Sequence, residues 1–439
     1  MKLQYLFTFI ISFFYSILFA QFTEMAPIPE RVTNNAVVEG YQNGVPYVYS
    51  FAGLDSTKHY NGIHLRSFRY NVQTDIWETI PPLPDTLGKI AASASRIGDI
   101  IYIIGGYHVF QNGSEVSSDK VHRFNTQTNS YLSDGAPIPV PIDDQVQVVW
   151  RDSLIFVITG WSNTENVPNV QIYNPTTDEW VQGTATPTNS DYPSFGAAGV
   201  IFNDTIFFFG GARNGDFDAQ RKMKKGIINP ENPTEISWSA FILDWGLRAY
   251  RPAAFSRWGS ELFWIGGSDV TYNYDGIAYS NGQGVEPNNR VIWYNSEFNM
   301  YQAITNIGEI PMDLRGVAVL NDSIQFLVGG MESGQMVSNK TIRIDYIPLL
   351  VNASNIEKQF GEISIYPNPA NQKLNIQFDN TENCKDAILK IYDAKGIEVK
   401  SLLLESCSVE TDINDLPSGV YQVVLSKNSN VITKQFVKH

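Results

Sequence analysis

The sequence has few cysteines and no excess of basic residues. Cys384 and Cys407 are the only cysteines among 439 residues, so the chain is not a disulfide-dense scaffold. Lys and Arg number 31 against 45 Asp and Glu, which gives a net charge of −14. That balance lacks the basic surface of a nucleic-acid-binding protein and argues against attraction to an anionic membrane. We therefore expect no nucleic-acid partner.

Charged residues make up only 17% of the chain, whereas aromatic residues make up 13%, and there are 33 glycines and 22 prolines. This composition favours strands and turns over helices. Hydrophobic residues, at 43%, are sufficient for large cores. A length of 439 residues exceeds that of one ordinary domain, so we expect several domains or an array of repeats.

Residues 1–20 have the pattern of a signal peptide. Lys2 precedes a mostly apolar run over residues 5–19, and Ala20 stands before Gln21, where we expect cleavage. The alternative is a transmembrane anchor, but a run of about 15 residues is short for a membrane-spanning helix, and no cluster of charges follows it. The sequence thus predicts export.

One pattern recurs six times between residues 21 and 350. Each repeat has a strand of small and β-branched residues, a polar pair, an apolar strand, and then two glycines or a close variant. The second strands of repeats one to six end at Ala52-Gly53, Gly105-Gly106, Thr159-Gly160, Gly210-Gly211, Gly266-Gly267 and Gly329-Gly330. Spacings between the second residues of these pairs are 53, 54, 51, 56 and 63 residues.

Four repeats also carry two aromatic residues seven positions apart, which are Tyr70 and Trp77, Phe124 and Tyr131, Tyr173 and Trp180, and Tyr294 and Tyr301. Repeat four departs from this pattern and has Trp238 after a longer loop. Together, these features resemble the kelch repeat, whose ~50-residue units are four-stranded blades of a β-propeller. The resemblance implies an all-β fold with six blades over residues 21–350.

Repeat six lacks the last strand of its blade. Residues 22–29 align with residues 77–84, with an aromatic residue and a final proline seven apart in both. We therefore expect the N-terminal strand of the mature chain to complete the last blade and close the six-bladed ring, which would remove open sheet edges.

The composition changes after residue 350. A polar linker over residues 351–362 leads to a strand-rich segment, residues 363–439, which contains Tyr366-Pro367-Asn368-Pro369 and Ser418-Gly419-Val420-Tyr421. These motifs resemble the C-terminal sorting domain of the bacterial type IX secretion system, a small β-sandwich. The resemblance implies that the secretion and sorting machinery is a partner and that the protein is secreted or held on the outer-membrane surface. The alternative is a purely structural immunoglobulin-like module.

The two cysteines lie in this segment. A hairpin turning at residues 394–397 would place Cys384 opposite Cys407, and an oxidising exterior would favour a disulfide. A bulge would change the register, so two free thiols are the open alternative.

In the propeller interpretation, residues before each inner strand and after each pair of glycines converge around one mouth of the channel. Ten of them are candidate ligand-binding residues: Arg31, Lys89, His108, Asp144, Trp161, Arg213, Tyr250, Arg251, Asp269 and Arg315. Arginines suit carboxylates, and aromatic rings suit sugars or cations. The alternative is that Arg and Asp form structural ion pairs between blades.

Other chemistries have little support in the sequence. His59 and His64 are five residues apart without nearby cysteines, so we expect no metal site and no cofactor. Kelch-like copper oxidases need a Tyr–Cys crosslink in the propeller, which has no cysteine here. The Ser-x-Asp-x-Gly turns of six-bladed sialidases are also missing.

Three hypotheses follow. The first is a monomeric, secreted or cell-surface module that binds a glycan or protein ligand. The second is an acidic-sugar mutarotase or epimerase similar to the kelch-type sialic-acid mutarotases, with arginines for the carboxylate. The third is an adhesive protein whose partner binds the blade edges.

Overall fold

The computed structural model describes residues 20–257, 259–305, 307–346, 363–378, 388–393, 398–404, 406, 408–427 and 430–439. The chain divides into two compact units, of which one is Ala20–Ile347 and the other contains Pro348–His439. In the described part of the chain, no helix has the length and hydrophobicity that crossing a membrane requires. Residues 1–19 of the expected signal peptide and the expected linker lie outside the described residues, whereas Ala20 is described.

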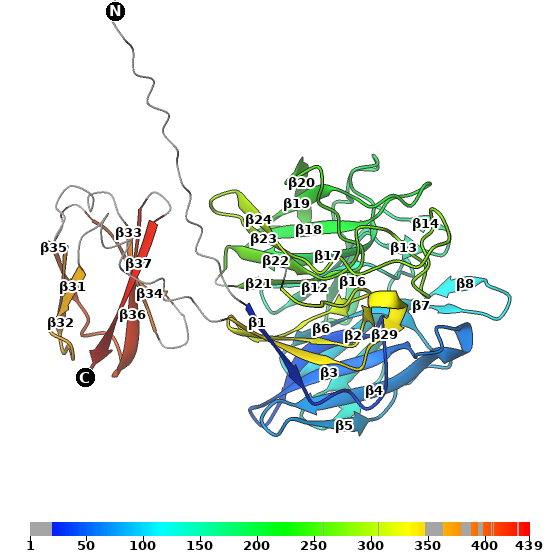
Figure 1. Cartoon of the computed structure of the whole chain (residues 1–439), viewed down its shortest axis with the longest axis horizontal. Helices are drawn as coiled ribbons and strands as arrows, with labels where there is room; N and C mark the ends of the chain where they lie inside the picture. Colours follow the sequence, from blue (N-terminus) through cyan, green and yellow to red (C-terminus); the bar gives the residue numbers. More distant parts are fainter. Residues whose placement is uncertain are drawn as a thin grey trace, which may run out of the picture. The chain divides into compact units, whose positions relative to one another are not determined.

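The described residues of the first unit form six sheets of four or five strands (Figure 1). The sheets of repeats one to three contain β2 (Ala36–Gln42), β3 (Val45–Leu54), β4 (Ile63–Asn71) and β5 (Ile76–Ile80), with the short β25 (Arg315–Gly316) added to β2; β6 (Ile90–Ile97), β7 (Ile100–Val109), β8 (Glu115–Ser117), β9 (Val121–Asn125) and β10 (Ser130–Tyr131); and β11 (Val146–Trp150), β12 (Leu154–Ile158), β15 (Val170–Asn174) and β16 (Glu179–Gln182).

The sheets of repeats four to six contain β17 (Phe195–Phe202), β18 (Thr205–Ala212), β19 (Lys222–Asn229) and β20 (Asn232–Ile242); β21 (Ala253–Arg257), β22 (Glu261–Ile265), β23 (Val291–Asn295) and β24 (Met300–Ile304); and β26 (Ala318–Asn321), β27 (Ile324–Val328), β30 (Thr341–Tyr346) and β1 (Ala20–Met25). Small elements lie between them: β13 (Trp161–Ser162), β14 (Glu165–Asn166), β28 (Met331–Glu332), β29 (Met336–Val337), and the 3-10 helices η1 (Tyr60–Gly62) and η2 (Ser333–Gln335).

The two ends of this unit meet in one sheet. Strand β1 pairs antiparallel with β30, and Phe22 lies opposite Ile344. The indole of Trp77 donates to the carbonyl of Ala26 at 2.9 Å, just as Trp180 donates to Ala136 at 2.8 Å. The segment after β1 therefore packs against repeat one in the way that the end of repeat two packs against repeat three.

A circuit of six backbone hydrogen bonds joins the starts of the inner strands. The N–H to C=O pairs are Asn34–Asp313, Ala91–Asn34, Asp144–Ala91, Gly196–Asp144, Arg251–Gly196 and Leu314–Arg251, at 2.7–3.3 Å. The six residues Asn34, Ala91, Asp144, Gly196, Arg251 and Asp313 all have φ between 50° and 69°. This left-handed conformation turns one peptide group of each repeat toward the next repeat.

The recurring glycines are explained by contact between neighbouring repeats. At Gly210, φ is +78° and a Cβ atom would lie 1.8 Å from the carbonyl oxygen of Ala249 in the next repeat. The adjacent Gly211 donates its N–H to that same oxygen at 2.8 Å. Only a residue without a side chain permits this approach.

The predicted aromatic pairs face each other across the two outer strands. Tyr70 lies opposite Trp77, and Tyr173 lies opposite Trp180, with ring centroids 5.4 Å and 4.9 Å apart. In repeat four, the ring of Trp238 instead covers Gly226. Repeat four thus has a glycine, not an aromatic residue, opposite its tryptophan, and the ring of Trp238 contacts Phe208 at a centroid distance of 6.0 Å.

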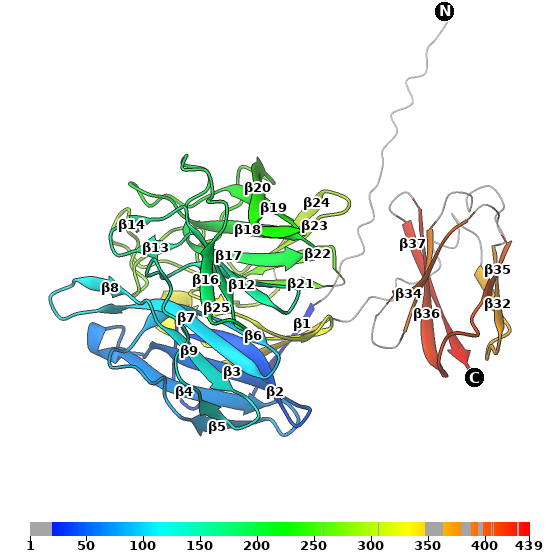
Figure 2. The ribbon, with the colours of Figure 1, turned by 180° about the vertical axis from the view of Figure 1, so that it is seen from behind.

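We define the front face as the end where the inner strands begin and the rear face as the end where they finish. The six inner strands are β2, β6, β11, β17, β21 and β25–β26, and Figure 2 shows this unit from behind the view of Figure 1. Repeat five carries the longest insertion, residues 268–289 between β22 and β23, which we call the repeat-five loop.

The described part of the second unit has two sheets. One contains β31 (Ile363–Tyr366), β32 (Lys373–Phe378) and β35 (Ser408–Asp412), and the other contains β34 (Glu398–Leu403), β33 (Ile388–Tyr392), β36 (Gly419–Lys427) and β37 (Asn430–Lys438). One apolar core, including Ile376, Ile391 and Phe436, holds residues from both sheets. Ile388 pairs with Leu403 in the register predicted for this hairpin, but the register shifts by one residue between Ile391 and Tyr392. Both cysteines lie outside the described residues.

Candidate functional site: a buried ion-pair network on the propeller axis

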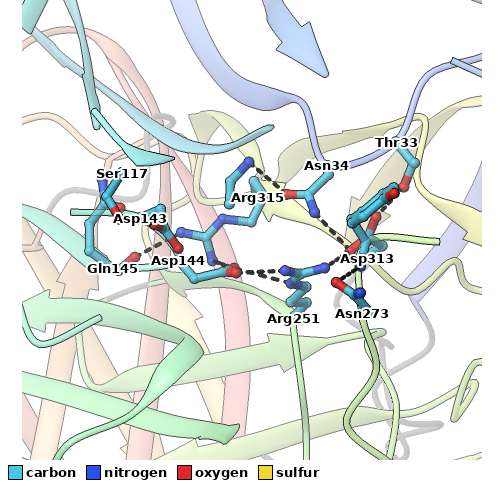
Figure 3. Close-up of polar contacts among 12 residues, drawn as sticks. Thr33, Asn34, Ser117, Asp143, Asp144, Gln145, Arg251, Asn273, Asp313 and Arg315 are labelled. Atoms are coloured by element: carbon cyan, nitrogen blue, oxygen red, sulfur yellow. Dashed lines mark hydrogen bonds and ion pairs between the residues drawn. The ribbon is translucent and has the colours of Figure 1, made fainter. Parts of the chain in front are cut away.

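Four charged side chains from three repeats meet at the front end of the inner strands (Figure 3). Arg251 binds Asp144 through two contacts, Nε to Oδ1 at 3.1 Å and Nη2 to Oδ2 at 2.6 Å. Its Nη1 donates to Asp313 Oδ1 at 2.9 Å. Nη1 of Arg315 lies 3.4 Å from Asp144 Oδ1. We call Asp144, Arg251, Asp313 and Arg315 the axial network.

Neutral side chains complete the axial network. Asp313 accepts hydrogen bonds from the Thr33 hydroxyl at 2.6 Å and the Asn34 amide at 3.2 Å. Arg315 Nη2 donates to the Ser93 hydroxyl at 3.0 Å and to the Gln145 carbonyl at 2.9 Å. Residues of repeats one, two, three, five and six thus share one set of polar contacts.

The axial network is buried and balanced in charge. The side chains of Asp144, Arg251, Asp313 and Arg315 are at most 3% exposed. Burial raises the pKa of Asp313, and the facing Arg251 and the Thr33 hydroxyl oppose that rise. Because each buried carboxylate faces a guanidinium, the network avoids the large cost of an isolated buried charge.

The repeat-five loop covers the network. Tyr272 of this loop is fully buried, and its ring centroid lies 5.6 Å from the guanidinium carbon of Arg251. Figure 3 shows Asn273 next to Arg251 and Asp313. Tyr274 packs against the apolar cluster of repeats one and two that contains Tyr107. The loop therefore reaches over the starts of several inner strands.

This cover changes the interpretation of three candidate residues. Asp144, Arg251 and Arg315 were expected to line an open mouth of the channel, and the structure does bring them together. However, their charged groups bind one another and are shielded from solvent, as in the structural alternative. The long insertion of repeat five, visible in the sequence only as the widest glycine spacing, supplies the shield.

An aromatic cluster lies beside the axial network. Trp161 contacts Phe195 and Phe217 with centroids 5.3 Å and 5.6 Å away, and Tyr279 lies 4.9 Å from Phe217. Candidate Tyr250 is the buried base of this cluster, 5.7 Å from Phe195. Trp161 and Phe217 are half-buried, whereas Tyr279 is 37% exposed. Three aromatic residues that contact one another or share the neighbour Phe217 are therefore each partly exposed to solvent.

The other candidate residues bind neighbours away from the axis. Arg31 is exposed and donates to the Val337 carbonyl at 2.7 Å, and His108 contacts the Gly88 carbonyl at 2.8 Å. Arg213 pairs with Asp216 and Asp218, while Asp269 pairs with Arg290 at 2.7 Å. The structure does not gather these four with the axial network.

Lys89 belongs to a separate buried cluster between repeats one and two. Its Nζ lies 2.7 Å from Asp85 Oδ2 and 3.1 Å from His122 Nε2, and His122 Nδ1 lies 2.9 Å from Asp134 Oδ1. Burial lowers the pKa of Lys89, which Asp85 partly restores. These contacts make Lys89 an internal ion-pair partner. Among the described residues, no group of three or more potential ligands could hold a metal ion.

A second buried lysine, Lys224, has no carboxylate within hydrogen-bond distance in the part of the chain that the structure describes. Its Nζ donates to the Ser194 hydroxyl and the Gly210 carbonyl, both at 3.3 Å. Burial lowers its pKa from 10.5 to about 7. Between pH 7 and 10.5, the unfolded chain therefore keeps the Lys224 proton, whereas the folded chain releases it. Lys224 thus makes the free energy of unfolding increase with pH across this range.

We expect Lys224→Met to raise the free energy of unfolding by about 2 kcal/mol at pH 6, because it removes a buried charge, and by less at pH 10. Chemical denaturation followed by tryptophan fluorescence at both pH values measures this difference. Lys225→Met is the matched control, because Lys225 is half-exposed. Equal effects of the two substitutions at pH 6 would contradict the prediction.

Several contributors to the site were not among the candidate residues, including Asp313, Phe217 and Tyr279. Asp313 had a signal, because it occupies the repeat position of Asp144 and Arg251, which were both chosen as candidates. Phe217 and Tyr279 lie on loops whose paths do not follow from the repeat pattern. No feature of the sequence placed them beside Trp161.

Comparisons with known proteins agree with this division. Residues 364–439 match the family model described as the secretion system C-terminal sorting domain. The chain carries a sorting domain. The resemblance recognised in residues 363–439 is thereby confirmed, and the all-β prediction is confirmed by the strands of both units. A chain with this domain is directed to secretion or to the cell surface.

The first unit is similar to kelch proteins. Kelch-like protein 36 of Bos taurus is 21% identical over 281 residues, covering 62% of this chain and 40% of that protein. Kelch-like protein terF of Aspergillus terreus is 26% identical over 173 residues, covering 38% of this chain and 36% of that protein. The solved structure of YjhT superimposes with a TM-score of 0.59 and 14% identity, covering 75% of this chain and 98% of that one. The first unit is a kelch-repeat propeller.

Proposed function

We propose that the mature protein is a six-bladed propeller over residues 21–350, joined by a linker at 351–362 to the sorting domain at 363–439. We also propose that the signal peptide at 1–20 and the type IX secretion system export it. The circuit of six backbone hydrogen bonds and the pairing of β1 with β30 support six blades and a ring closed by the N-terminal strand. A closed ring leaves few edges for pairing with another chain, which supports a monomer.

We propose that this exported propeller binds a neutral glycan on its front face. The observation that carries the proposal is the aromatic cluster of Trp161, Phe217 and Tyr279, three contacting residues that are each partly exposed to solvent. Aromatic side chains offer a flat apolar face with polar groups at the rim, which suits the apolar face of a sugar ring. A protein ligand is the competing class for the same surface.

The charges of the front face favour a neutral sugar over an acidic one. An acidic-sugar mutarotase would need guanidinium groups free to bind a carboxylate. Arg251 and Arg315 already face Asp144 and Asp313 in a buried network. Arg213 is 37% exposed but contacts two aspartates. Arg31 is exposed and donates to the Val337 carbonyl, but it lies away from the axial network. An acidic substrate would have to displace these carboxylates.

The test is binding of the mature chain, residues 21–439, to an array of neutral and sialylated glycans. We expect neutral glycans to bind and Trp161→Ala to weaken them at least about tenfold, the order expected for losing a buried aromatic contact. Trp245→Ala is the matched control, since Trp245 is 70% exposed and outside the aromatic cluster.

Each alternative gives a different result. Binding restricted to sialylated glycans, with faster anomer interconversion of N-acetylneuraminate in proton NMR, would replace the proposal with the mutarotase hypothesis. Binding that Trp245→Ala abolishes and Trp161→Ala leaves intact would move the site away from the aromatic cluster. No glycan binding at all would refute the proposal and favour a protein ligand.

A further inference from the structure

The repeat-five loop, which covers the axial network, also forms a cavity of about 250 Å³. All the residues that line this cavity belong to the loop, from Ser268 to Asn288. Among them, Val270, Asn281 and Gln283 are exposed, so the cavity is reached from solvent. The loop thus carries an accessible hollow of its own.

This cavity adjoins the aromatic cluster. Ala278, which lines the cavity, belongs to the apolar cluster against which Trp161 and Phe217 pack. The loop is also tied directly to Phe217, because the hydroxyl of Thr271 donates to the Phe217 carbonyl at 2.6 Å. Tyr279, the most exposed ring of the aromatic cluster, directly follows Ala278 in the chain. The cavity and the aromatic rings are therefore neighbouring parts of the front face.

Amide side chains supply the free hydrogen-bonding groups of the cavity. Gln283 is exposed, and its side-chain amide has no partner among the described residues. Asn281 and Asn288 use only their oxygens, which accept from the backbone N–H groups of Gln283 at 2.9 Å and of Arg290 at 3.2 Å. Their Nδ2 groups stay unpaired in the part of the chain that the structure describes. Amides donate and accept hydrogen bonds, as the hydroxyl groups of a sugar do.

The two charged residues that line the cavity already have partners. Asp269 binds Arg290 through two contacts, at 3.0 Å and 2.7 Å. Glu286 accepts from the backbone N–H of Gly334 and from the side-chain amide of Gln335, both at 3.1 Å. No cation pairs with Glu286 among the described residues, so its carboxylate would repel an acidic sugar. The free groups of the cavity therefore match a neutral polar ligand.

The volume of the cavity lies below the ~300–1,000 Å³ of a complete small-molecule site, so it suits one part of a ligand that continues outside it. We propose that the cavity is the second subsite of the front-face glycan site. One sugar unit packs against the aromatic cluster, and the next unit of the glycan enters the cavity and binds the amides of Asn281 and Gln283. This inference rests on the proposed function and specifies its ligand as a neutral glycan of two or more units.

Saturation-transfer NMR titrations of the mature chain test this subsite with four pairs of probes. The pairs are cellobiose with D-glucose, lactose with D-galactose, N,N′-diacetylchitobiose with N-acetyl-D-glucosamine, and mannobiose with D-mannose. We expect at least one disaccharide to bind at least about fivefold more tightly than its monosaccharide, the order expected for one added hydrogen bond.

Two substitutions locate the gain in the cavity. Asn281→Ala and Gln283→Ala should each remove most of the disaccharide's advantage and leave the monosaccharide unchanged, whereas Trp161→Ala should weaken both. The two amide side chains are exposed, so these variants should fold. Asn112→Ala is the matched control. Like Asn281, Asn112 is exposed, precedes a glycine and accepts from the backbone N–H two residues further on, that of Ser114, at 3.0 Å.

The outcomes separate this subsite from the front-face site itself. Disaccharides that bind no more tightly than monosaccharides would overturn the subsite, and so would a gain that neither amide substitution reduces or that Asn112→Ala reduces equally. If Trp161→Ala still weakened binding in these cases, the front-face glycan site would stand without the cavity. Binding of none of the probes would also overturn the subsite, and the glycan array would then decide separately on the front-face site.

Discussion

Arg251→Met is expected to lower the free energy of unfolding of the propeller by about 3–5 kcal/mol, because it leaves two buried carboxylates without their shared cation. The guanidinium of Arg251 binds both Asp144 and Asp313, and all three side chains are at most 2% exposed. Guanidinium denaturation followed by tryptophan fluorescence measures the change. All nine tryptophans precede residue 351, so the signal reports the propeller alone.

Arg213→Met provides the matched control. Arg213 also contacts two aspartates, but its side chain is 37% exposed and those of Asp216 and Asp218 are 54% and 63% exposed. Solvent screening should hold its effect below about 1 kcal/mol. If Arg251→Met and Arg213→Met lowered the free energy of unfolding by similar amounts, the axial network would stabilise the propeller no more than a surface ion pair does.

A triple variant tests the mechanism of this loss. Adding Asp144→Asn and Asp313→Asn to Arg251→Met removes the two uncompensated charges while keeping the shape of both side chains. We expect this to recover part of the lost stability. If the triple variant were no more stable than Arg251→Met, the loss would come from the packing of the Arg251 side chain and not from its charge.

Gly210→Ala is expected to lower the free energy of unfolding by about 3–4 kcal/mol, the sum of an unfavourable φ and a steric overlap. A Cβ atom at this position would lie 1.8 Å from the backbone oxygen of Ala249, and backbone cannot move aside as a flexible side chain can. The same denaturation experiment measures it.

Gly215→Ala separates the two causes. Gly215 has a φ of +87°, close to that of Gly210, but no atom lies within 4 Å of the place that an added methyl group would take. It should therefore show only the conformational cost, about 1 kcal/mol. If both variants lost the same stability, close contact between repeats would not be the reason for the recurring glycines.

Much of the fold could be predicted because the same sequence features recur. One pair of glycines is a weak signal, but six pairs or close variants at similar spacing, each after an apolar strand, predicted second strands that the structure contains, such as β18, which includes the predicted end at Gly210-Gly211. Local turn chemistry and strand alternation repeat in every unit, so errors in one repeat are corrected by the others.

The candidate site was predicted only in part. The structure brings the candidates Asp144 and Arg251 together because they share one position in the repeat, and Arg315 joins them from two residues beyond the equivalent Asp313. Their burial was not predicted, because it depends on Tyr272 and its neighbours in a loop that has no counterpart in the other repeats. Likewise, Lys89 occupies the expected place in its repeat but turns toward Asp85 and His122.

The sequence by itself determined that this protein is an all-β repeat propeller with a C-terminal sorting domain, because period, turn residues and terminal motifs are local and repeated. Only the tertiary structure decided that the axial charges neutralise one another and that the repeat-five loop covers them. These facts depend on side chains from repeats far apart in the chain, such as Asp144 and Arg251, whose meeting on the axis fixes both their charge balance and their access to solvent.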